Sequence, residues 1–325
     1  MGLRGMEMDA ALKERTRPAR SGQDLAPATA DVTTGLAQLA QHGVAIHEGF
    51  IAPDFADRIR ERMEEQAYME RKLGIGLVGD ESGLSGTPTC EAEGDIRHAK
   101  AGELDDPIYQ VLSSLVNKGD VFRELMMSPV GHAYADGVFR GDPWVLWGMN
   151  GIITRKGSKE QFLHTDSSTV PQDMLTRPVQ INCFVCITDF ELEMGPTGFV
   201  PGSHLGDRPH YDGDEAAPRA IGVAKKGSAI IWDGSTWHGQ CEHSSDKTRY
   251  AVAMTYCLYA IRGGENYPAS IHDAVYEKLT EPERRVLGFE SKMVGAMNVF
   301  GPRSADDRRH AIGYSPFFTP ELHRD

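Results

Sequence analysis

Two histidines and one carboxylate that suit a single metal ion constrain the fold more than any other feature of this sequence. His164 and Asp166 flank one residue, and in an extended strand two such residues point to the same face. His238 lies far downstream, so it completes the set only if its strand faces the first. Two histidines and a carboxylate on one side of a metal leave three positions open, as in the facial triad of non-haem Fe(II) oxygenases. The pattern therefore predicts an Fe(II) site built from strands that are distant in sequence.

Arg249 strengthens this interpretation because of the strand on which it lies. The residues from Arg249 to Leu258 alternate in character, which indicates a β-strand. One face of this strand carries Arg249, Ala251, Ala253, Thr255 and Cys257, and the other carries Tyr250, Val252, Met254, Tyr256 and Leu258. An arginine that shares its face with small side chains has room for a small dicarboxylate, held by paired N–H···O contacts.

Several segments occur in an order that is typical of one known family. They are Gln161–Asp166, Gly195–His204, Gly227–Gly234, Trp237–Gly239 and Arg249. On these segments the chain resembles the phytanoyl-CoA dioxygenase family of Fe(II)/2-oxoglutarate-dependent oxygenases, over roughly residues 40–285. The HxD pair alone is a weak signal because it arises often by chance, whereas the whole set at this spacing is specific.

The resemblance implies a role for each residue of the set. His164, Asp166 and His238 would bind Fe(II), and Arg249 would hold the far carboxylate of the co-substrate 2-oxoglutarate. With O2 as second co-substrate, the enzyme would hydroxylate or otherwise oxidise a C–H bond of a small organic molecule, releasing succinate and CO2. Asp166 stands where related halogenases have a small residue, which favours hydroxylation over halogenation.

Four further positions concern the co-substrate pocket. Gln161 and Thr197 match positions that often help to hold 2-oxoglutarate in relatives. Met194 and His243 depart from the family pattern, since many relatives have Asn at both positions. Neither departure touches the predicted triad, but both concern the local turns and the rim of the pocket.

Two other functions are alternatives to this one. The first is a catalytically silent jelly-roll binding protein, which would have no chemical need for the intact triad and Arg249. The second is a cupin-type metal dioxygenase that does not use 2-oxoglutarate, whose chemistry needs no dicarboxylate clamp. A structural zinc site is disfavoured, because such sites usually have four ligands with much Cys.

The order of the predicted elements indicates the fold class. Helical patterns are expected from Pro53 to about Lys72, from Leu104 to about Met127, and over 267–287; strands are expected at 44–46, 145–153, 179–188, 228–232 and 249–258. Helices first and many short strands later predict a mainly β fold with flanking helices and a double-stranded β-helix (jelly-roll, cupin-like) core.

The organisation of the chain is predicted as one domain with two regions that set selectivity. Residues 1–30 lack periodicity and are expected to form a disordered tail, with a single domain over 31–325. The Gly-rich, polar stretch 74–106 is expected to be a loop that acts as a lid. This stretch and the segment 167–178 carry no motif, and we expect substrate selectivity to reside there.

Composition narrows the partners and the compartment. A net charge of −13 argues against a nucleic-acid partner, and no apolar run approaches the ~20 residues that a membrane span needs. Neither a secretory signal nor a peroxisomal address is recognisable, so we expect a cytoplasmic protein with no membrane partner. Five cysteines do not indicate a disulfide framework, and Cys183 and Cys186 should face opposite ways on one strand.

The substrate itself is predicted only by class. The selectivity segments lack an evident basic cluster, which disfavours CoA esters, because their phosphates would need Lys or Arg. We therefore expect a small molecule without CoA, such as a natural-product intermediate. The sequence leaves open whether the protein forms a homo-oligomer.

Overall fold

Two antiparallel sheets form the centre of the computed structural model, which describes residues 25–79, 96–206, 217–261 and 264–289. The strands are β1 (Val44–His47), β2 (Leu77–Gly79), β3 (Ile96–His98), β4 (Tyr109–Leu112), β5 (Trp144–Thr154), β6 (Gln180–Cys186), β7 (Thr197–Phe199), β8 (Ala220–Ile221), β9 (Ala229–Asp233), β10 (His238–Gln240) and β11 (Arg249–Leu258). The large sheet has the order β1-β9-β6-β11-β5-β4-β2-β3, and the small sheet has the order β10-β7-β8.

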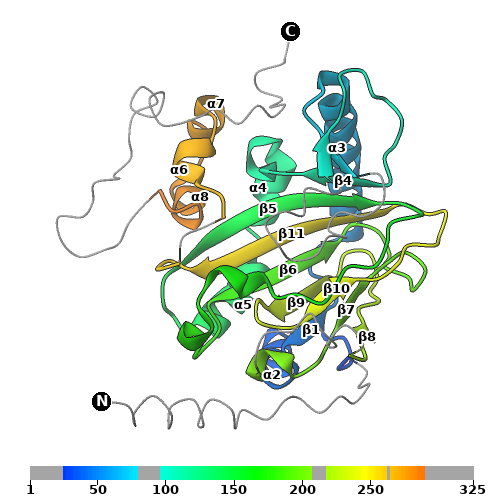
Figure 1. Ribbon diagram of the computed structural model, residues 1–325. Helices are drawn as coiled ribbons and strands as arrows, with labels where there is room; N and C mark the ends of the chain where they lie inside the picture. The colour runs from blue at the N-terminus through cyan, green and yellow to red at the C-terminus, as the bar shows by residue number, and fades with distance from the viewer. Residues whose placement is uncertain (1–24, 80–95, 207–216, 262–263, 290–325) are drawn as a thin grey trace, which may run out of the picture.

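Helices cover the face of the large sheet that lies opposite the small sheet (Figure 1). They are α2 (Val32–His42), α3 (Pro53–Leu73), α4 (Asp120–Met126), α5 (Pro129–Phe139), α6 (Tyr267–Ser270), α7 (Asp273–Tyr276) and α8 (Glu281–Val286). The predicted helix from Pro53 is confirmed: proline occupies its first turn, and Gly74 ends it with a left-handed φ of 74°.

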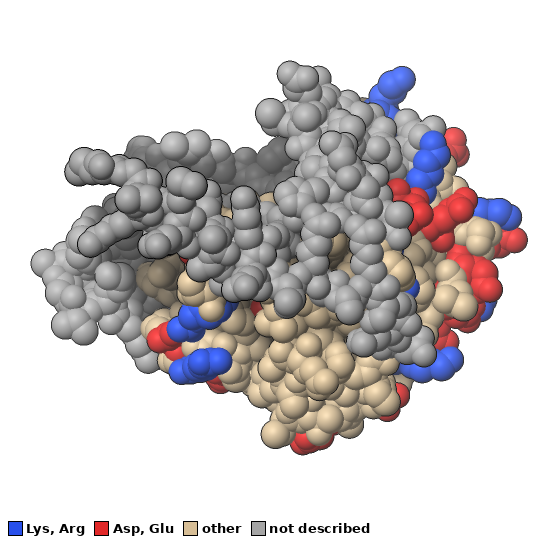
Figure 2. Space-filling model, turned by 60° about the horizontal axis from the view of Figure 1, so that its bottom comes forward, with Lys and Arg blue, Asp and Glu red and all other residues tan. Residues whose placement is uncertain are grey.

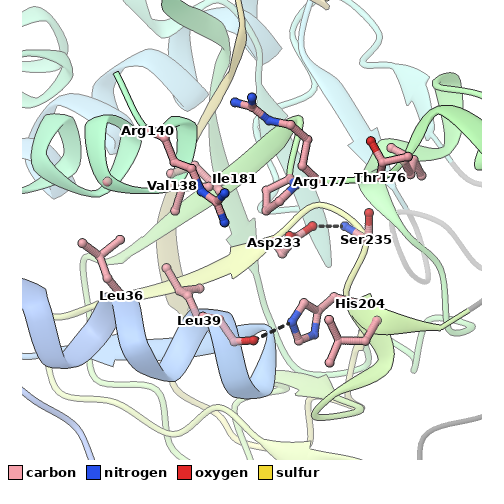
Figure 3. A pocket seen from close by; sticks show the side chains of 15 residues that line it. Leu36, Leu39, Val138, Arg140, Thr176, Arg177, Ile181, His204, Asp233 and Ser235 are labelled. Atoms are coloured by element: carbon pink, nitrogen blue, oxygen red, sulfur yellow. Dashed lines mark hydrogen bonds between the residues drawn. The ribbon is translucent and has the colours of Figure 1, made fainter. Parts of the chain in front are cut away.

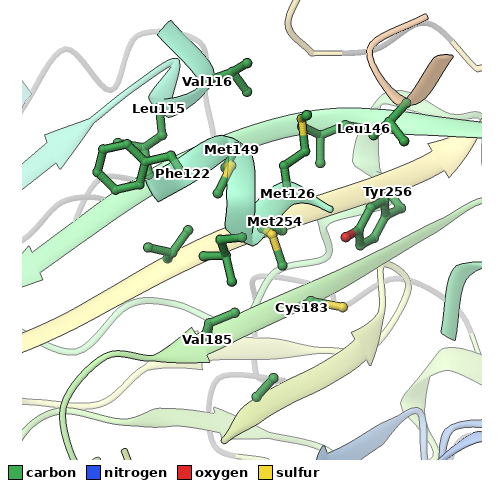
Figure 4. Packing of buried hydrophobic residues seen from close by; sticks show 14 of the residues in the cluster. Leu115, Val116, Phe122, Met126, Leu146, Met149, Cys183, Val185, Met254 and Tyr256 are labelled. Carbon is green, nitrogen blue, oxygen red and sulfur yellow. The ribbon is translucent and has the colours of Figure 1, made fainter. Parts of the chain in front are cut away.

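Alternation along β11 sorts its side chains between two cores, as predicted. Val252 and Met254 pack in the core beneath the helices, where Met254 lies near Cys183 (Figure 4). Ala251 belongs to a second cluster, together with Cys186 and residues of both sheets. Cys183 and Cys186 therefore face opposite ways, which excludes a shared metal. Two facing antiparallel sheets with helices on one side confirm the predicted double-stranded β-helix core.

Two predicted helices are wrong in part. Within 104–127 only α4 is an α-helix, because Tyr109–Leu112 pairs as β4 with β5 and thereby satisfies its backbone in the sheet. The stretch 267–287 is not one helix but α6, α7 and α8, and a capping box at Thr280 starts the last of them anew. In both stretches tertiary contacts override a pattern that is helical on average.

The predicted tail and lid lie partly outside the described residues. Residues 1–24 and 80–95 are not described, so neither a tail nor a lid can be tested there. Next to them, the amide of Thr29 donates to the Ile46 carbonyl at 3.0 Å, which attaches residues 25–30 to β1. On the other side, β2 and β3 add two strands to the far edge of the large sheet. The predicted loop 74–106 thus contains regular structure at both ends.

Charge is mixed on the face that Figure 2 shows. Among the described residues visible there, Lys and Arg side chains are scattered among Asp and Glu rather than gathered into one basic surface. None of the described helices combines the length and the hydropathy that a membrane crossing requires.

Candidate metal centre

His164, Asp166 and His238 meet between the two sheets. The backbones of His164 and His238 form an antiparallel bridge with N···O distances of 2.9 and 3.0 Å, so the segment of His164 does face β10. The predicted strand is only this isolated bridge, because a 3-10 helix begins at Asp166. Their ring centroids are 4.3 Å apart. The Asp166 carboxylate lies 3.3 Å from Nε2 of His238 and 3.9 Å from Nε2 of His164. One ligand atom of each residue lies within 4.8 Å of the others, a separation that a single metal ion can span.

Hydrogen bonds to backbone carbonyls fix the orientation of both imidazoles. Nδ1 of His164 lies 3.1 Å from the Phe162 carbonyl, and Nδ1 of His238 lies 2.9 Å from the Thr236 carbonyl. Since a carbonyl only accepts, each Nδ1 carries the proton, and each Nε2 keeps its lone pair for a metal. This is the arrangement that histidine ligands of metals usually have. The residues present therefore fit a metal ion.

The pKa values of Asp166 and His164 are both lowered, which favours the unprotonated forms that bind a metal. Burial raises the pKa of Asp166, but the neighbouring His238 and hydrogen bonds outweigh it and lower that pKa to about 2. Burial, with His238 adding to it, lowers the pKa of His164 to about 4. Burial also lowers the pKa of His238, yet the adjacent Asp166 carboxylate raises it above its usual value. Of the three groups, His238 is therefore the one from which a metal most readily has to displace a proton.

Two side chains donate to one oxygen of Asp166. Nδ2 of Asn182 donates to Oδ2 at 2.7 Å, and Nε1 of Trp232 donates to the same atom at 3.1 Å. From the sequence, both Trp232 and Trp237 are expected in the core, with Trp237 also close to the metal because it precedes His238. Trp232 instead contacts both Asp166 and the His238 ring, at 5.0 Å between centroids, whereas Trp237 packs in a separate small cluster.

Arg249 lies on the inner face at the start of β11 and is 1% exposed. Its guanidinium donates to the Gly195 carbonyl and, at 2.9 Å, to Oε1 of Gln240. Both partners are neutral, Nε has no hydrogen-bond partner, and no ion pair forms with the acidic residues that the structure describes. Burial lowers the pKa of Arg249 to about 10. The site thus holds a buried cation without a compensating anion, which is costly unless a ligand supplies one.

Gln240 is a functional candidate that the sequence interpretation missed. It lies two residues after His238 on β10, so the i, i+2 rule that linked His164 to Asp166 would have placed it on the same face. Its Oε1 accepts from Arg249, while its Nε2 donates to Oγ of Ser158 at 2.6 Å. Gln240 therefore connects the strand of a candidate metal ligand to the arginine.

The two weaker co-substrate candidates lie close to Gln240. Oε1 of Gln161 accepts a hydrogen bond from the backbone N–H of Gln240 at 3.0 Å, so the Gln161 side chain contacts the backbone of β10. Thr197 pairs with Gln240 across β7 and β10 and is 7% exposed. Both thus border the strand that carries the partner of Arg249.

The two departures from the family pattern are neighbours. Met194 and His243 form an antiparallel bridge, and both are nearly fully buried. Gly195 follows Met194, and its carbonyl accepts a hydrogen bond from Arg249. Gly195 also packs closely against His243, because a Cβ added to Gly195 would lie 3.0 Å from Cβ of His243. His243 itself is held by the Lys247 carbonyl at 2.9 Å. The paired departures therefore shape the backbone behind the arginine rather than the metal site.

Open space lies beside Gly148 on β5. Gly148 is buried and pairs with Thr255, yet a Cβ added to it would meet nothing within 4 Å. Asn150 and Ala253, the next inward pair along the same strands, are partly exposed. These inward positions on β5 and β11 therefore carry small or polar side chains and leave room beside Gly148.

A cavity lies on the helix-covered side, between α2, the end of α5 and residues 175–178 (Figure 3). Its volume is about 380 Å³, with Leu39 and Ile181 in its apolar wall and Asp233 among its polar groups. Asp233 is 6% exposed, and burial raises its pKa to about 6. The cavity contains none of the candidate metal ligands, but it reaches Ser235, whose hydroxyl lies 3.0 Å from that of Ser167.

Comparison with known sequences identifies one family. The family model described as "Phytanoyl-CoA dioxygenase (PhyH)" matches residues 39–251. The dioxygenase trt7 of Aspergillus terreus is 26% identical over 226 residues, which are 67% of this chain and 70% of that protein. The Fe(II)/2-oxoglutarate-dependent dioxygenase nvfF of Aspergillus novofumigatus is 26% identical over 268 residues, which are 77% of this chain and 80% of that protein.

Comparison with solved structures supports the same fold. The non-haem α-ketoglutarate-dependent epimerase SnoN from nogalamycin biosynthesis superposes with a TM-score of 0.53 at 20% identity. The alignment covers 70% of this chain and 82% of that one. At this level of identity, the likeness concerns the fold alone.

Proposed function

This chain belongs to the phytanoyl-CoA dioxygenase family and is an Fe(II)/2-oxoglutarate-dependent dioxygenase, and we propose that it oxidises a C–H bond of a small organic molecule. We place the metal on His164, Asp166 and His238 and the far carboxylate of 2-oxoglutarate on Arg249. When bound, the iron supplies the oxidising chemistry that couples conversion of 2-oxoglutarate to succinate and CO2 with oxidation of the organic substrate.

The buried guanidinium of Arg249, which has no anionic partner among the described residues, is the observation that carries this proposal. A silent binding protein would gain nothing from such a cation, and a metal dioxygenase that does not use 2-oxoglutarate would have no anion to pair with it. Removing a charge from water without a partner is unfavourable, so an arginine in this setting favours a bound carboxylate. Its planar fork suits paired contacts to one carboxylate group.

The chain's own residues divide the remaining work. Asp166 and the two histidines offer three ligand atoms on one side, which leaves the other side for both co-substrates. Gln240 holds the guanidinium of Arg249 in place before the co-substrate arrives. We propose that Gln161 and Thr197 keep β10 and β7 at the spacing that this pocket needs.

The experiment for the function is a stoichiometric turnover assay. Purified protein with Fe(II), 2-oxoglutarate and O2 is expected to release succinate, faster when an organic substrate is present. Anaerobic samples and samples without iron should release none. Turnover of an organic substrate without any succinate would contradict the proposal and would favour a metal dioxygenase of another kind.

The relatives suggest the class of the organic substrate. We propose a natural-product intermediate, because SnoN, whose fold this chain shares, belongs to nogalamycin biosynthesis. Gly148 pairs with Thr255, which is connected to Asp166 through Asn182, and we place the reacting part of the substrate in the space beside Gly148.

Filling that space should block the organic substrate selectively. Gly148→Leu fills the space that the substrate is proposed to occupy, and a steric clash of this kind costs substrate binding about 1–3 kcal/mol, or about five- to 150-fold. We expect substrate-stimulated succinate release to fall by that factor, while affinities for metal and 2-oxoglutarate stay within about twofold. Gly148→Ala is the matched control, with a smaller loss. If the organic substrate stimulated succinate release by Gly148→Leu as fully as in the wild type, the substrate would not bind in the space beside Gly148.

Metal affinity should depend on pH through one proton. Asp166, with a pKa of about 2, and His164, with a pKa of about 4, already have their binding forms at mildly acidic pH. The pKa of His238 is raised, so below it each metal ion must displace one proton. Titration with Co(II) should show about tenfold weaker binding per pH unit as pH falls below the pKa of His238. A slope near two protons in that range would contradict the assignment.

A further inference from the structure

One row of side chains crosses three adjacent strands beside the candidate metal centre. Thr255 on β11 pairs with Asn182 on β6, and Asn182 pairs with Trp232 on β9. All three lie on the inner face of the large sheet and are buried, at 5–7% exposure. The row ends at Asp166, because both Asn182 and Trp232 donate to its Oδ2.

The hydrogen bonds within this row have a fixed direction. The Thr255 hydroxyl has one hydrogen and donates it to Oδ1 of Asn182, at 2.5 Å. That contact holds the carboxamide so that its NH2 group, rather than its oxygen, faces the carboxylate at 2.7 Å. Without the hydroxyl the carboxamide could turn over, and its oxygen would then meet a carboxylate oxygen.

The same row leaves the other carboxylate oxygen available. Oδ2 of Asp166 receives two donors, whereas Oδ1 receives no hydrogen bond from the residues that the structure describes. A carboxylate anchored at one oxygen keeps a fixed plane and offers the second oxygen to a metal. Partners of this kind commonly orient carboxylate ligands of metals.

We propose that Thr255 and Asn182 are positioning residues that act in series to aim the Asp166 carboxylate at the metal. This inference rests on the proposed function, since it assumes that Asp166 is a metal ligand. The roles are unequal: Asn182 touches the carboxylate, and Thr255 acts only through Asn182. Loss of either residue should therefore weaken metal binding, and loss of both should be no worse than loss of Asn182 alone.

The experiment is a double-mutant cycle read out by Co(II) titration and by the visible absorption of the Co(II) protein. Asn182→Leu should weaken Co(II) binding by about 10- to 100-fold and alter the absorption bands. Thr255→Val, which keeps the side-chain shape, should weaken binding by about tenfold. Thr255→Ser restores the hydroxyl and should stay within about threefold of the wild type. The double variant should match Asn182→Leu, which indicates coupling in series.

Two results would overturn the inference. One is a Thr255→Val protein with unchanged Co(II) affinity and spectrum, and the other is a double variant whose loss is the product of the single losses. If Asn182→Leu does not fold, the comparison of Val and Ser at position 255 still decides. Failure of the wild type to bind Co(II) would contradict the proposed function, whereas normal binding in all variants would contradict only the role of the row.

Discussion

Replacement of either candidate histidine ligand should abolish metal binding and turnover together. His164→Ala and His238→Ala each leave two ligand atoms where three now lie within 4.8 Å. Asn182 and Trp232 beside the site offer no replacement, because both direct their N–H donors at Asp166. We expect metal content near zero after dialysis, and succinate release at the level of samples without iron.

The matched control is a histidine that takes no part in the site. His98 is exposed at the edge strand β3, so His98→Ala should keep full metal content and activity. Thermal unfolding separates loss of the ligand from loss of the fold, since both ligand variants should still unfold cooperatively. Full metal occupancy in both His164→Ala and His238→Ala would exclude the proposed site.

Periodicity predicted the parts of the fold that are determined locally. The alternation from Arg249 to Leu258 becomes β11, and the helical pattern from Pro53 to about Lys72 becomes α3. Tyr109–Leu112 could not be predicted in this way, because four residues carry too short a pattern and their strand state comes from pairing with β5. Partners far away in sequence decide such segments, so local propensity cannot identify them.

The candidate site was predictable where spacing alone specifies geometry. His164 and Asp166 share a face by the two-residue period, and His238 follows from the family pattern. Asn182 and Thr255 were out of reach, because their contact arises from the register between β6 and β11, which no local pattern reveals. Gln240, by contrast, was within reach of the same two-residue rule, counted from His238. The sequence pattern thus indicates candidate ligands more readily than the residues that orient them.

Arg249→Ala should weaken 2-oxoglutarate binding more than any other change away from the metal. The side chain is 1% exposed, so a carboxylate bound to it would be shielded from water. Breaking a buried ion pair costs on the order of 3–5 kcal/mol, because the remaining charge is left without a partner. This corresponds to a loss in affinity of roughly a hundredfold or more. Calorimetric titration of the Co(II) protein with 2-oxoglutarate measures it directly.

The Lys variant tests whether the fork of the guanidinium matters beyond its charge. Arg249→Lys keeps a cation but cannot donate to Gly195, Gln240 and a carboxylate in one plane, so an intermediate affinity is expected. Metal affinity should change little in both variants, because Arg249 is not among the three clustered ligand residues. An Ala variant with an unchanged Michaelis constant for 2-oxoglutarate would show that the buried cation serves another anion. The proposed co-substrate site would then have to be abandoned even if the metal centre stands.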